Sequence, residues 1–547
     1  MLKQLFSFLI LNALCLALQW WRPGPVAWVA LDALLLMGLL GLIRSGGWRR
    51  RIAWGLGAGY VALALFVAAD GVMRLALGRP LNLYLDSALP GKVVDLVVTN
   101  LGYVWALGFA AVLVLSVLVL AWLVRTLLLF AGRQVSVRQA KAMTALALVG
   151  LALLPVRAIP VTVSGAEVLA TQVERIMDAQ AQTEAFSRQL NTVESTGNRG
   201  RAVAMDRLAG DDVLIGFIES YGVSALGDPR YRPVLDPRLD AMEQALSSAG
   251  LSVVSGRLRS PVQGGQSWLA HATVLSGLWV DSAMAYDVML SSGYTTLIDD
   301  FRQTGHDTVA VMPAITRAWP EGRQLGYRHI YDAQRIDYAG PALNWVTMPD
   351  QYTWSWFQRQ VRDASATPIF AELALISSHA PWVPILPVLP DWQAIGDGQV
   401  FAPWKGAGEA PAELWRNPER VRQHYIRAID YALAVATDYA IRHVDEHTLL
   451  ILLGDHQPAP LVTGEGASRD VPVHIIARDP DLLAPFTGPA GLPGFRRGVR
   501  PDLDRPGPRM DQLRSFLHRH FATALTAESW PTSASVGVAA LSEAEGH

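Results

Sequence analysis

Apolar residues fall into two patterns that divide the chain near residue 160. Up to that point they gather in five long stretches, at residues 5–21, 25–43, 52–70, 103–124 and 140–159. Each stretch is close to the ~20 apolar residues that a helix needs to cross a bilayer. No stretch of this length follows. The pattern therefore predicts a transmembrane domain of five helices over residues 1–160.

Basic residues in the loops predict how these helices are oriented. Seven of them lie in the loops after the second and fourth stretches: Arg44, Arg49, Arg50, Arg51, Arg133, Arg138 and Lys141. Short loops rich in Lys and Arg stay in the cytoplasm. With five crossings, the N-terminus is then cytoplasmic and everything after residue 160 is extracytoplasmic.

A cleaved signal peptide is the alternative interpretation of residues 1–21, because this segment has a short basic start and an apolar core. The stretch ends in Gln19-Trp20-Trp21-Arg22-Pro23, which contains no small-residue cleavage site. Paired tryptophans suit a membrane interface. A first membrane helix is therefore the preferred interpretation.

The apolar pattern after residue 210 consists of short continuous runs separated by helical segments. The runs are Val213–Ile218, Leu251–Val254, Thr308–Met312, Pro368–Ile376, Leu449–Leu453 and Val471–Ile476. Continuous apolar runs are typical of strands that are covered on both faces. We therefore predict an α/β domain with a mainly parallel central sheet over residues 211–522, and a long helix at 419–443.

Two segments flank this domain. Residues 161–210 carry an apolar stripe at Val168, Leu169, Val173 and Ile176, which predicts an amphipathic linker helix followed by a flexible stretch. Residues 523–547 are mostly small and polar, and we expect a disordered tail there.

Composition limits the kinds of function. Charged residues make up 17% of the chain and the mean hydropathy is +0.24, as expected when part of a protein lies in lipid. The net charge of -2 and the lack of a basic tail give no basis for nucleic-acid binding. The single cysteine, Cys15, excludes a disulfide framework and a thiolate zinc site. Any metal must have oxygen and imidazole ligands.

Polar residues directly follow three of the predicted strands. Glu219 follows the first, His379 lies three residues after Ile376, and Asp455 and His456 follow the run that ends at Leu453. Ligands of an open parallel α/β sheet bind outside the carboxyl ends of its strands, so these side chains are expected to meet at one edge. Each alone is more often a helix cap or a loop hydrogen bond. Together, their oxygen and nitrogen atoms suit Mn, Mg or Zn.

At these positions the sequence resembles the sulfatase-like branch of the alkaline phosphatase superfamily. Within it, the sequence resembles the lipoteichoic acid synthase and membrane phosphoglycerol or phosphoethanolamine transferase group. The motifs are FIESYG at 217–222, SSHAPW at 377–382 and LLGDHQP at 452–458, in that order. The resemblance extends to the five membrane helices, the linker helix and the extracytoplasmic domain. It implies a bacterial cytoplasmic membrane protein with one divalent metal on Glu219, Asp455 and His456, Mn being expected and Mg or Zn the alternatives.

The nucleophile that this resemblance implies lies between the first two motifs. The sulfatase segment C-x-P-S-R-A-x-x-x-T-G superimposes without a gap on residues 267–277, SWLAHATVLSG. This places Ser267 at the nucleophile, where it is also a metal ligand, and His271 at the sulfatase arginine. A serine in the Gly-rich segment GGQSW could equally cap the next helix, and a helix N-terminus there would attract phosphate in either case.

Departures from the family pattern shift the expected substrate. Leu269 and His271 replace the Pro and Arg that mark serine or cysteine oxidation in sulfatases, so sulfatase activity is not expected. The lipoteichoic acid synthase group has Thr at the nucleophile, and Ser267 keeps the hydroxyl. His271, Arg317, Trp319 and Trp382 are the expected substrate contacts, although a surface or packing role suits Arg317 and Trp319 as well.

The expected activity is transfer of a phosphoglycerol or phosphoethanolamine headgroup from a membrane phospholipid to an envelope glycan or lipid. The transfer would pass through a covalent phospho-serine at Ser267, with His379 protonating the leaving alcohol or deprotonating the acceptor. Water as the acceptor would instead make the protein a phosphodiesterase or another sulfatase-like hydrolase. A third possibility is a non-catalytic protein that binds or assembles envelope components.

Overall fold

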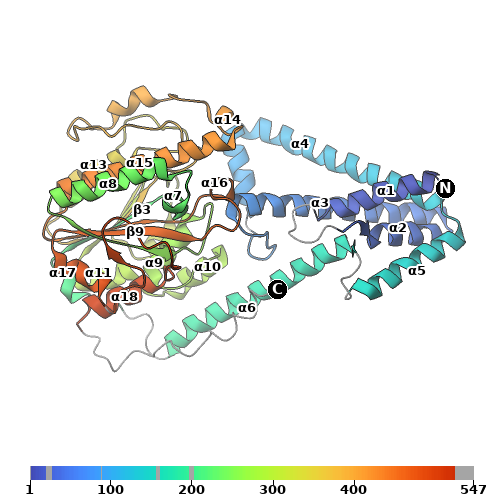
Figure 1. The fold of residues 1–547 in the computed structure, drawn as a ribbon, viewed down its shortest axis with the longest axis horizontal. Coiled ribbons are helices and arrows are strands. Elements are labelled where there is room, and N and C mark those ends of the chain that lie inside the picture. Colours follow the sequence, from blue (N-terminus) through green and yellow to red (C-terminus); the bar gives the residue numbers. More distant parts are fainter. Residues whose placement is uncertain are drawn as a thin grey trace. The chain divides into compact units, whose positions relative to one another are not determined.

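The structure is a computed structural model, and it describes residues 2–19, 27–87, 89–154, 160–195, 202–488 and 490–523 (Figure 1). Its contacts divide the chain into two compact units, residues 1–186 and 187–547. Three predictions lie wholly or partly outside the described residues. These are the interfacial pair Trp20 and Trp21, the flexible stretch at residues 196–201, and the tail from residue 524 onward.

Helices occupy the predicted membrane stretches of the first unit. They are α1 (Leu2–Ala17), α2 (Leu31–Leu42), α3 (Gly46–Leu77), α4 (Leu89–Arg133) and α5 (Val137–Leu153). Strands β1 (Val29–Ala30) and β2 (Val161–Thr162) form a parallel pair. Among the described residues, α3 and the 102–133 part of α4 are long and apolar enough to cross a membrane. The structure therefore supports a membrane unit, and five crossings remain a prediction.

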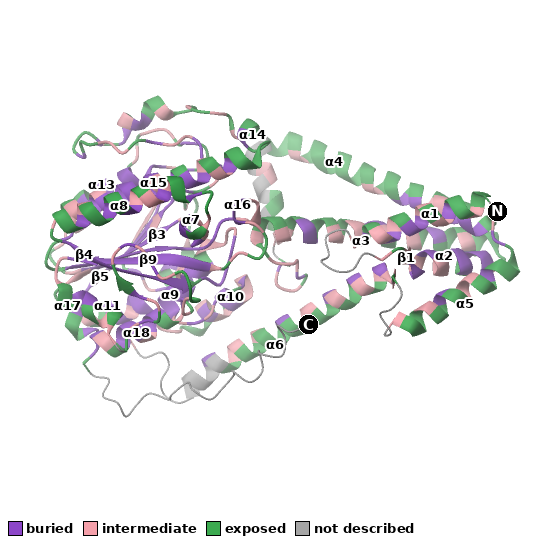
Figure 2. Ribbon diagram, viewed as in Figure 1, coloured by how far each residue is buried: buried purple, intermediate pink, exposed green. Residues whose placement is uncertain are grey.

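Helix α4 shows why this unit belongs in lipid. Its side chains are exposed along most of its length (Figure 2), and Trp105 and Leu107 are 75% and 70% exposed. Large contiguous apolar surfaces are rare on soluble monomers, and lipid tails solvate them at no cost.

Small residues bring the inner helices of this unit together. A Cβ atom built on Gly38 of α2 would lie 2.4 Å from the Thr144 hydroxyl of α5, and one on Gly132 of α4 would lie 2.9 Å from Leu40. Glycine at these contacts allows the helix backbones to approach closely, as is common in membrane bundles.

Helix α6 (Ser164–Ser195) lies where the linker helix is predicted, and its first part packs within the first unit. The carboxylate of Asp32 accepts a hydrogen bond of 3.0 Å from the Gly165 amide at the start of α6. Further along, Arg175 pairs with Asp70 of α3 at 3.2 Å. Polar contacts thus attach α6 to two helices of the membrane unit.

The second unit is built on an eight-stranded sheet of order β10-β4-β9-β8-β3-β7-β5-β6. The strands are β3 (Asp212–Ile218), β4 (Ser252–Arg259), β5 (Asp307–Met312), β6 (His329–Asp332), β7 (Ile369–Leu375), β8 (Thr448–Gly454), β9 (Asp470–Ala477) and β10 (Arg496–Arg497). Each of the six predicted runs overlaps a strand. The short strands β6 and β10 were not predicted, because their residues are not buried as a continuous apolar run.

The sheet is mixed, so the mainly parallel sheet that the sequence predicts is not confirmed. Strands β8, β3, β7, β5 and β6 pair in parallel, whereas β9 is antiparallel to both of its neighbours and β10 is antiparallel to β4. Every residue of β9 is buried, as is every residue of its neighbour β8. Continuous burial marks a strand that is covered on both faces, and it carries no information about direction.

Helices cover both faces of this sheet (Figure 1). One face carries α8 (Arg232–Ser248), α13 (Asp350–Phe357) and α15 (Pro418–His443), and the other carries α9 (Ser267–Ser276), α11 (Leu297–Thr304) and α18 (Gln512–Phe521). Helix α15 is the predicted long helix. The remaining helices are α7 (Ser224–Gly227), α10 (Ala283–Ser292), α12 (Pro320–Gln324), α14 (Pro411–Leu414), α16 (Pro460–Thr463) and α17 (Pro480–Thr487).

Candidate active site

Two central strands carry the predicted metal residues to the same place. Strands β3 and β8 are parallel neighbours in which Ile218 pairs with Gly454, so Glu219 and Asp455 follow at the same level. Asp455 and His456 are each 1% exposed. The structure therefore brings these side chains together at the carboxyl edge of the sheet, as the sequence predicts.

The side chains of Glu219, Asp455 and His456 are close enough to share a metal ion. Their ligand atoms lie within 4.8 Å of one another, and among the described residues no other such group occurs. The Nε2 atom of His456 is 3.4 Å from a Glu219 oxygen and 3.7 Å from an Asp455 oxygen. Two carboxylates and one imidazole fit a divalent cation such as Mn, Mg or Zn.

Electrostatics in this group also favour a cation. Burial acts to raise the pKa of Glu219, but the charges of His456 and His379 outweigh it and lower the pKa to about 2. Burial and the neighbouring Glu219 charge raise the pKa of Asp455 to about 6. Two buried carboxylates this close repel each other, and a bound divalent cation relieves the repulsion that a single histidine only partly offsets.

Ser267 lies within hydrogen-bond distance of this group. Its Oγ donates to a Glu219 oxygen at 3.1 Å and lies 3.3 Å from His456 Nε2. Ser267 is the first residue of α9, so its hydroxyl lies where the free amides and the dipole of the helix attract an anion. The hydroxyl, the metal residues and an anion-binding helix end thus coincide.

Strained backbone flanks the site on both sides. Ser220, next to Glu219, has φ of 58°, and Gln266, before Ser267, has φ of 66°. The left-handed region costs an ordinary residue roughly 1–2 kcal/mol. Two hydrogen bonds keep Ser220 there, since its amide donates to Asp455 at 2.8 Å and its carbonyl accepts from the Tyr425 hydroxyl at 3.0 Å. Strain of this kind is concentrated at functional sites.

A cavity of about 250 Å³ opens beside the serine. Five predicted residues line it in addition to Ser267: Glu219, His271, Trp319, His379 and Asp455. Most of the remaining wall is apolar, formed by Phe217, Trp268, Leu275, Tyr286, Met312, Ile315 and Leu325 among others. His379 is exposed, and its Nδ1 lies 2.6 Å from the Ala380 carbonyl.

Two predicted substrate contacts do not line this cavity. Trp382 is 4% exposed, stacks on Trp415, and donates through Nε1 to the Ser378 carbonyl at 2.6 Å. It therefore supports the turn that carries His379. Arg317 lines a separate hollow with Arg323 and Arg335, and Trp319 forms part of the wall of both spaces.

The sequence analysis missed Glu372, which lines the same cavity from the middle of β7 and is 1% exposed. One of its oxygens is 2.6 Å from Nδ1 of His271, and the other accepts a hydrogen bond from the Tyr327 hydroxyl. The signal in the sequence was a single glutamate inside the apolar run Pro368–Ile376. A carboxylate in a strand that is covered on both faces needs a partner, and so marks a site.

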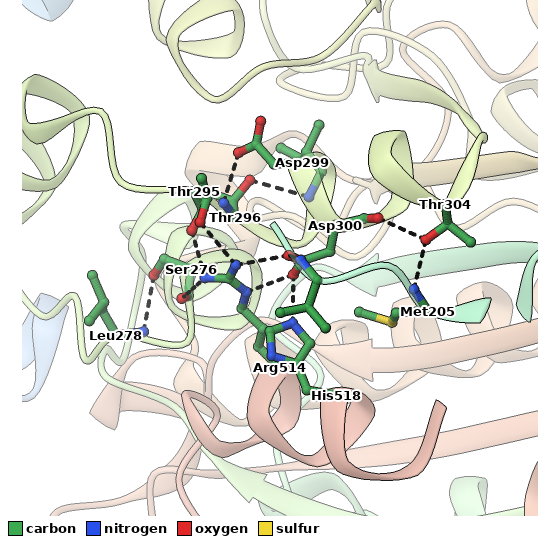
Figure 3. A network of polar contacts seen from close by, with 12 residues as sticks. Met205, Ser276, Leu278, Thr295, Thr296, Asp299, Asp300, Thr304, Arg514 and His518 are labelled. Atoms are coloured by element: carbon green, nitrogen blue, oxygen red, sulfur yellow. Dashed lines mark hydrogen bonds and ion pairs between the residues drawn. The ribbon is translucent and has the colours of Figure 1, made fainter. Parts of the chain in front are cut away.

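Arg514 of α18 holds the C-terminal end of α9, the helix that begins at Ser267 (Figure 3). It pairs with Asp300 of α11 at 2.8 Å and donates to the carbonyl of Ser276, the last residue of α9, at 3.0 Å. His518 contacts the same carboxylate at 2.8 Å. A cation at the C-terminus of α9 satisfies its free carbonyl and stabilises its dipole. No sequence signal pointed to this cluster.

Comparisons with known proteins give structural likenesses only. No family model matches the chain, and no curated protein matches it. Lipoteichoic acid synthase LtaP from Listeria monocytogenes is 14% identical, over 53% of this chain and 71% of that one, with a TM-score of 0.34. The phosphoglycerol transferase GacH from Streptococcus pyogenes is 12% identical, over 62% and 82%, with a TM-score of 0.37.

A third similar structure is that of an integral membrane protein. The lipooligosaccharide phosphoethanolamine transferase EptA from Neisseria meningitidis is 12% identical, over 87% of each chain, with a TM-score of 0.41. At these identities and TM-scores, conclusions about activity must come from the residues of the site. These three solved structures belong to the phosphoglycerol and phosphoethanolamine transferase group that the motifs resemble, and phosphonate monoester hydrolases are among the other similar structures.

Proposed function

We propose that this protein is a membrane-anchored, metal-dependent phosphotransferase that moves a phosphate-ester headgroup from a phospholipid to an envelope acceptor. The observation that carries the proposal is the position of Ser267. Its hydroxyl lies between Glu219 and His456, at the N-terminus of a helix and beside a cavity. This arrangement combines a nucleophile, a cation site and an anion site.

Glu219, Asp455 and His456 would hold one divalent metal together with Ser267, and Mn is the ion we propose. When bound, such an ion lowers the effective pKa of a hydroxyl and neutralises charge on phosphoryl oxygens. Mg and Zn suit the same ligands.

The reaction would proceed in two displacements. In the first, Ser267 Oγ, whose proton has passed to solvent, attacks phosphorus as an anion, the Oγ–P bond forms, the bond from phosphorus to the diacylglycerol oxygen breaks, and His379 gives that oxygen its proton; the second displacement returns the same Oγ anion. In the second, an acceptor hydroxyl gives its proton to His379 and attacks phosphorus, and the Oγ–P bond breaks. The amides at the start of α9 stabilise the phosphoryl oxygens in both steps.

The substrate follows from the proposed arrangement of the chain. With residues 1–160 in a bacterial cytoplasmic membrane, 161–210 as a linker and 211–522 outside, the catalytic domain would work next to outer-leaflet phospholipids. A phosphoglycerol or phosphoethanolamine headgroup is therefore the proposed transferred group. His271 and Trp319 line the cavity that would hold it, and Arg317 and Trp382 would act only from outside that cavity.

The test is mass spectrometry of the full-length protein in detergent with Mn²⁺ and labelled phosphatidylglycerol or phosphatidylethanolamine. We expect an adduct on Ser267 whose mass equals one phospho-headgroup, and its loss when a glycan or lipid acceptor is added. Ser267→Ala is the matched control. Release of the headgroup to water alone would make the protein a hydrolase, and full turnover by Ser267→Ala would remove the serine from the mechanism.

A further inference from the structure

The buried carboxylate of Glu372 has no role in the reaction outlined above. It lies in the middle of β7 among apolar residues, and it borders the cavity that contains Ser267. Burying a carboxylate costs several kcal/mol, and even a well-paired one rarely adds stability over an apolar residue of similar size. Stability therefore does not explain this residue.

Both oxygens of Glu372 are engaged by side chains that can donate. One accepts from His271 Nδ1 at 2.6 Å, and the other accepts from the Tyr327 hydroxyl. Burial, and then the charge of Glu372, raise the pKa of Tyr327 well above its usual value. The tyrosine therefore keeps its proton and acts only as a donor, which leaves the negative charge of Glu372 directed at His271.

The ring of His271 is fixed from two further directions. His271 lies four residues after Ser267 on α9, so both side chains are on the same face of the helix. Its ring stacks on Phe217 of β3, with centroids 3.8 Å apart and an interplanar angle of 13°. Nδ1 is used by Glu372, and among the described residues Nε2 has no hydrogen-bond partner. Nε2 is thus the available nitrogen of a residue that lines the cavity.

We propose that Glu372 and Tyr327 position His271 so that Nε2 donates a hydrogen bond to a non-bridging oxygen of the phosphoryl group on Ser267. This proposal rests on the proposed function. In this arrangement Nδ1 donates to the Glu372 carboxylate and Nε2 to the phosphoryl oxygen, so the ring connects the two acceptors. The mostly apolar cavity thereby gains a phosphate-binding donor that a buried carboxylate orients. Glu372 touches neither substrate nor reacting atoms, so it is a positioning residue.

The test is a double-mutant cycle on the full-length, Mn²⁺-loaded protein. The variants are Glu372→Gln, His271→Gln and the double variant. The measurements are kcat and KM for bis(p-nitrophenyl) phosphate and, separately, the affinity for inorganic phosphate. Losing a charge-assisted hydrogen bond to a phosphoryl oxygen should lower kcat about 30-fold in each single variant. The double variant should lose no more than His271→Gln alone, because Glu372 acts through that ring.

Controls separate this role from a structural one. Asp430→Asn removes a carboxylate that pairs with Arg238 at 2.7 Å outside the cavity, and should leave kcat and phosphate affinity unchanged. Tyr327→Phe should lower kcat about 3-fold, and it tests the same contact should Glu372→Gln fail to fold. The proposal is wrong if the kcat losses of the two single variants multiply in the double variant. It is also wrong if Glu372→Gln lowers the Tm but leaves kcat and phosphate affinity unchanged.

The two proposals fail in different ways. If Ser267→Ala keeps full phosphodiester turnover, the proposed function is wrong, whatever the cycle gives. If Ser267→Ala is inactive and Glu372→Gln binds inorganic phosphate as tightly as the unchanged protein, only the positioning role of Glu372 is wrong.

Discussion

Two buried clusters in the second unit both combine carboxylate and histidine side chains, but they differ in how far the protein balances their negative charge. Asp300 meets Arg514 and His518, and a backbone amide, that of Val203, donates to it as well. Burial raises its pKa, but the charges and hydrogen bonds of Arg514 and His518 outweigh this effect and lower it. Its negative charge is thus fully compensated within the protein.

The second cluster, Glu219, Asp455 and His456, places two carboxylates against one histidine at the edge of a cavity. Its charges are not balanced by the protein, as the opposite pKa shifts of Glu219 and Asp455 indicate. The difference is informative, because burial of charged groups occurs in both places. Only an uncompensated charge next to open space calls for a ligand.

The largest effect should come from Ser267→Ala, which removes the proposed nucleophile and leaves both clusters intact. Turnover of a phosphodiester should fall at least about 1,000-fold. The Tm should stay within about 2 °C, because the side chain is small and partly exposed. Steady-state kinetics and thermal unfolding of the same preparation check this. A large fall in Tm would mean that the serine has a structural role.

Asp300→Asn should destabilise the fold by about 3–5 kcal/mol, because it leaves the Arg514 guanidinium buried and without its counter-charge. Denaturant unfolding measures this loss. Asp300→Asn combined with Arg514→Met should recover part of it, since no buried charge then remains unpaired. Equal stability of Asp300→Asn and the unchanged protein would show that the first cluster is not structural.

A third buried histidine, His474, contacts hydroxyl groups rather than carboxylates. It lies 3.0 Å from the Tyr221 hydroxyl and 2.8 Å from the Ser255 hydroxyl, and burial lowers its pKa from 6.5 to about 4. The unfolded chain then binds more protons below pH 6.5. Stability is complete above that pH, and up to about 3 kcal/mol is lost as the pH falls towards 4. The free energy of unfolding should be lower at pH 5 than at pH 7.5, as denaturant unfolding at both pH values would show. In His474→Asn this difference between the two pH values should be smaller.

The smallest effect has the opposite sign. In the metal-free protein, Asp455→Asn should raise stability by about 1 kcal/mol, because it ends the repulsion with Glu219 and keeps an oxygen for the amides of Ser220 and His456. The same variant should lose the increase in Tm that Mn²⁺ gives the unchanged protein. Thermal scans with and without Mn²⁺ measure both. A destabilised metal-free variant would mean that the cluster is balanced after all.

Much of this site was accessible from the sequence. Glu219, Asp455 and His456 each follow a continuous apolar run, and strand ends in an α/β sheet lie side by side, so proximity followed from position. Glu372 was not found as a site residue, because its importance depends on which helix covers β7. Arg514 lies far from Ser276 in the chain, and the direction of β9 leaves no trace in its apolar pattern. These features depend on tertiary contacts between distant segments, which local sequence patterns do not reveal.

The network in Figure 3 extends to the first described residues after the linker helix. The Met205 amide donates to the Thr304 hydroxyl at 2.9 Å (Figure 3), and the Val203 amide donates to Asp300 at 2.8 Å. Residues 203–205 are therefore built into the support behind the serine helix. These contacts limit where the chain can be shortened by engineering or cut by a protease. A soluble form that begins before Val203 keeps this support, and one trimmed beyond Met205 gives up both hydrogen bonds and the buried Met205 side chain.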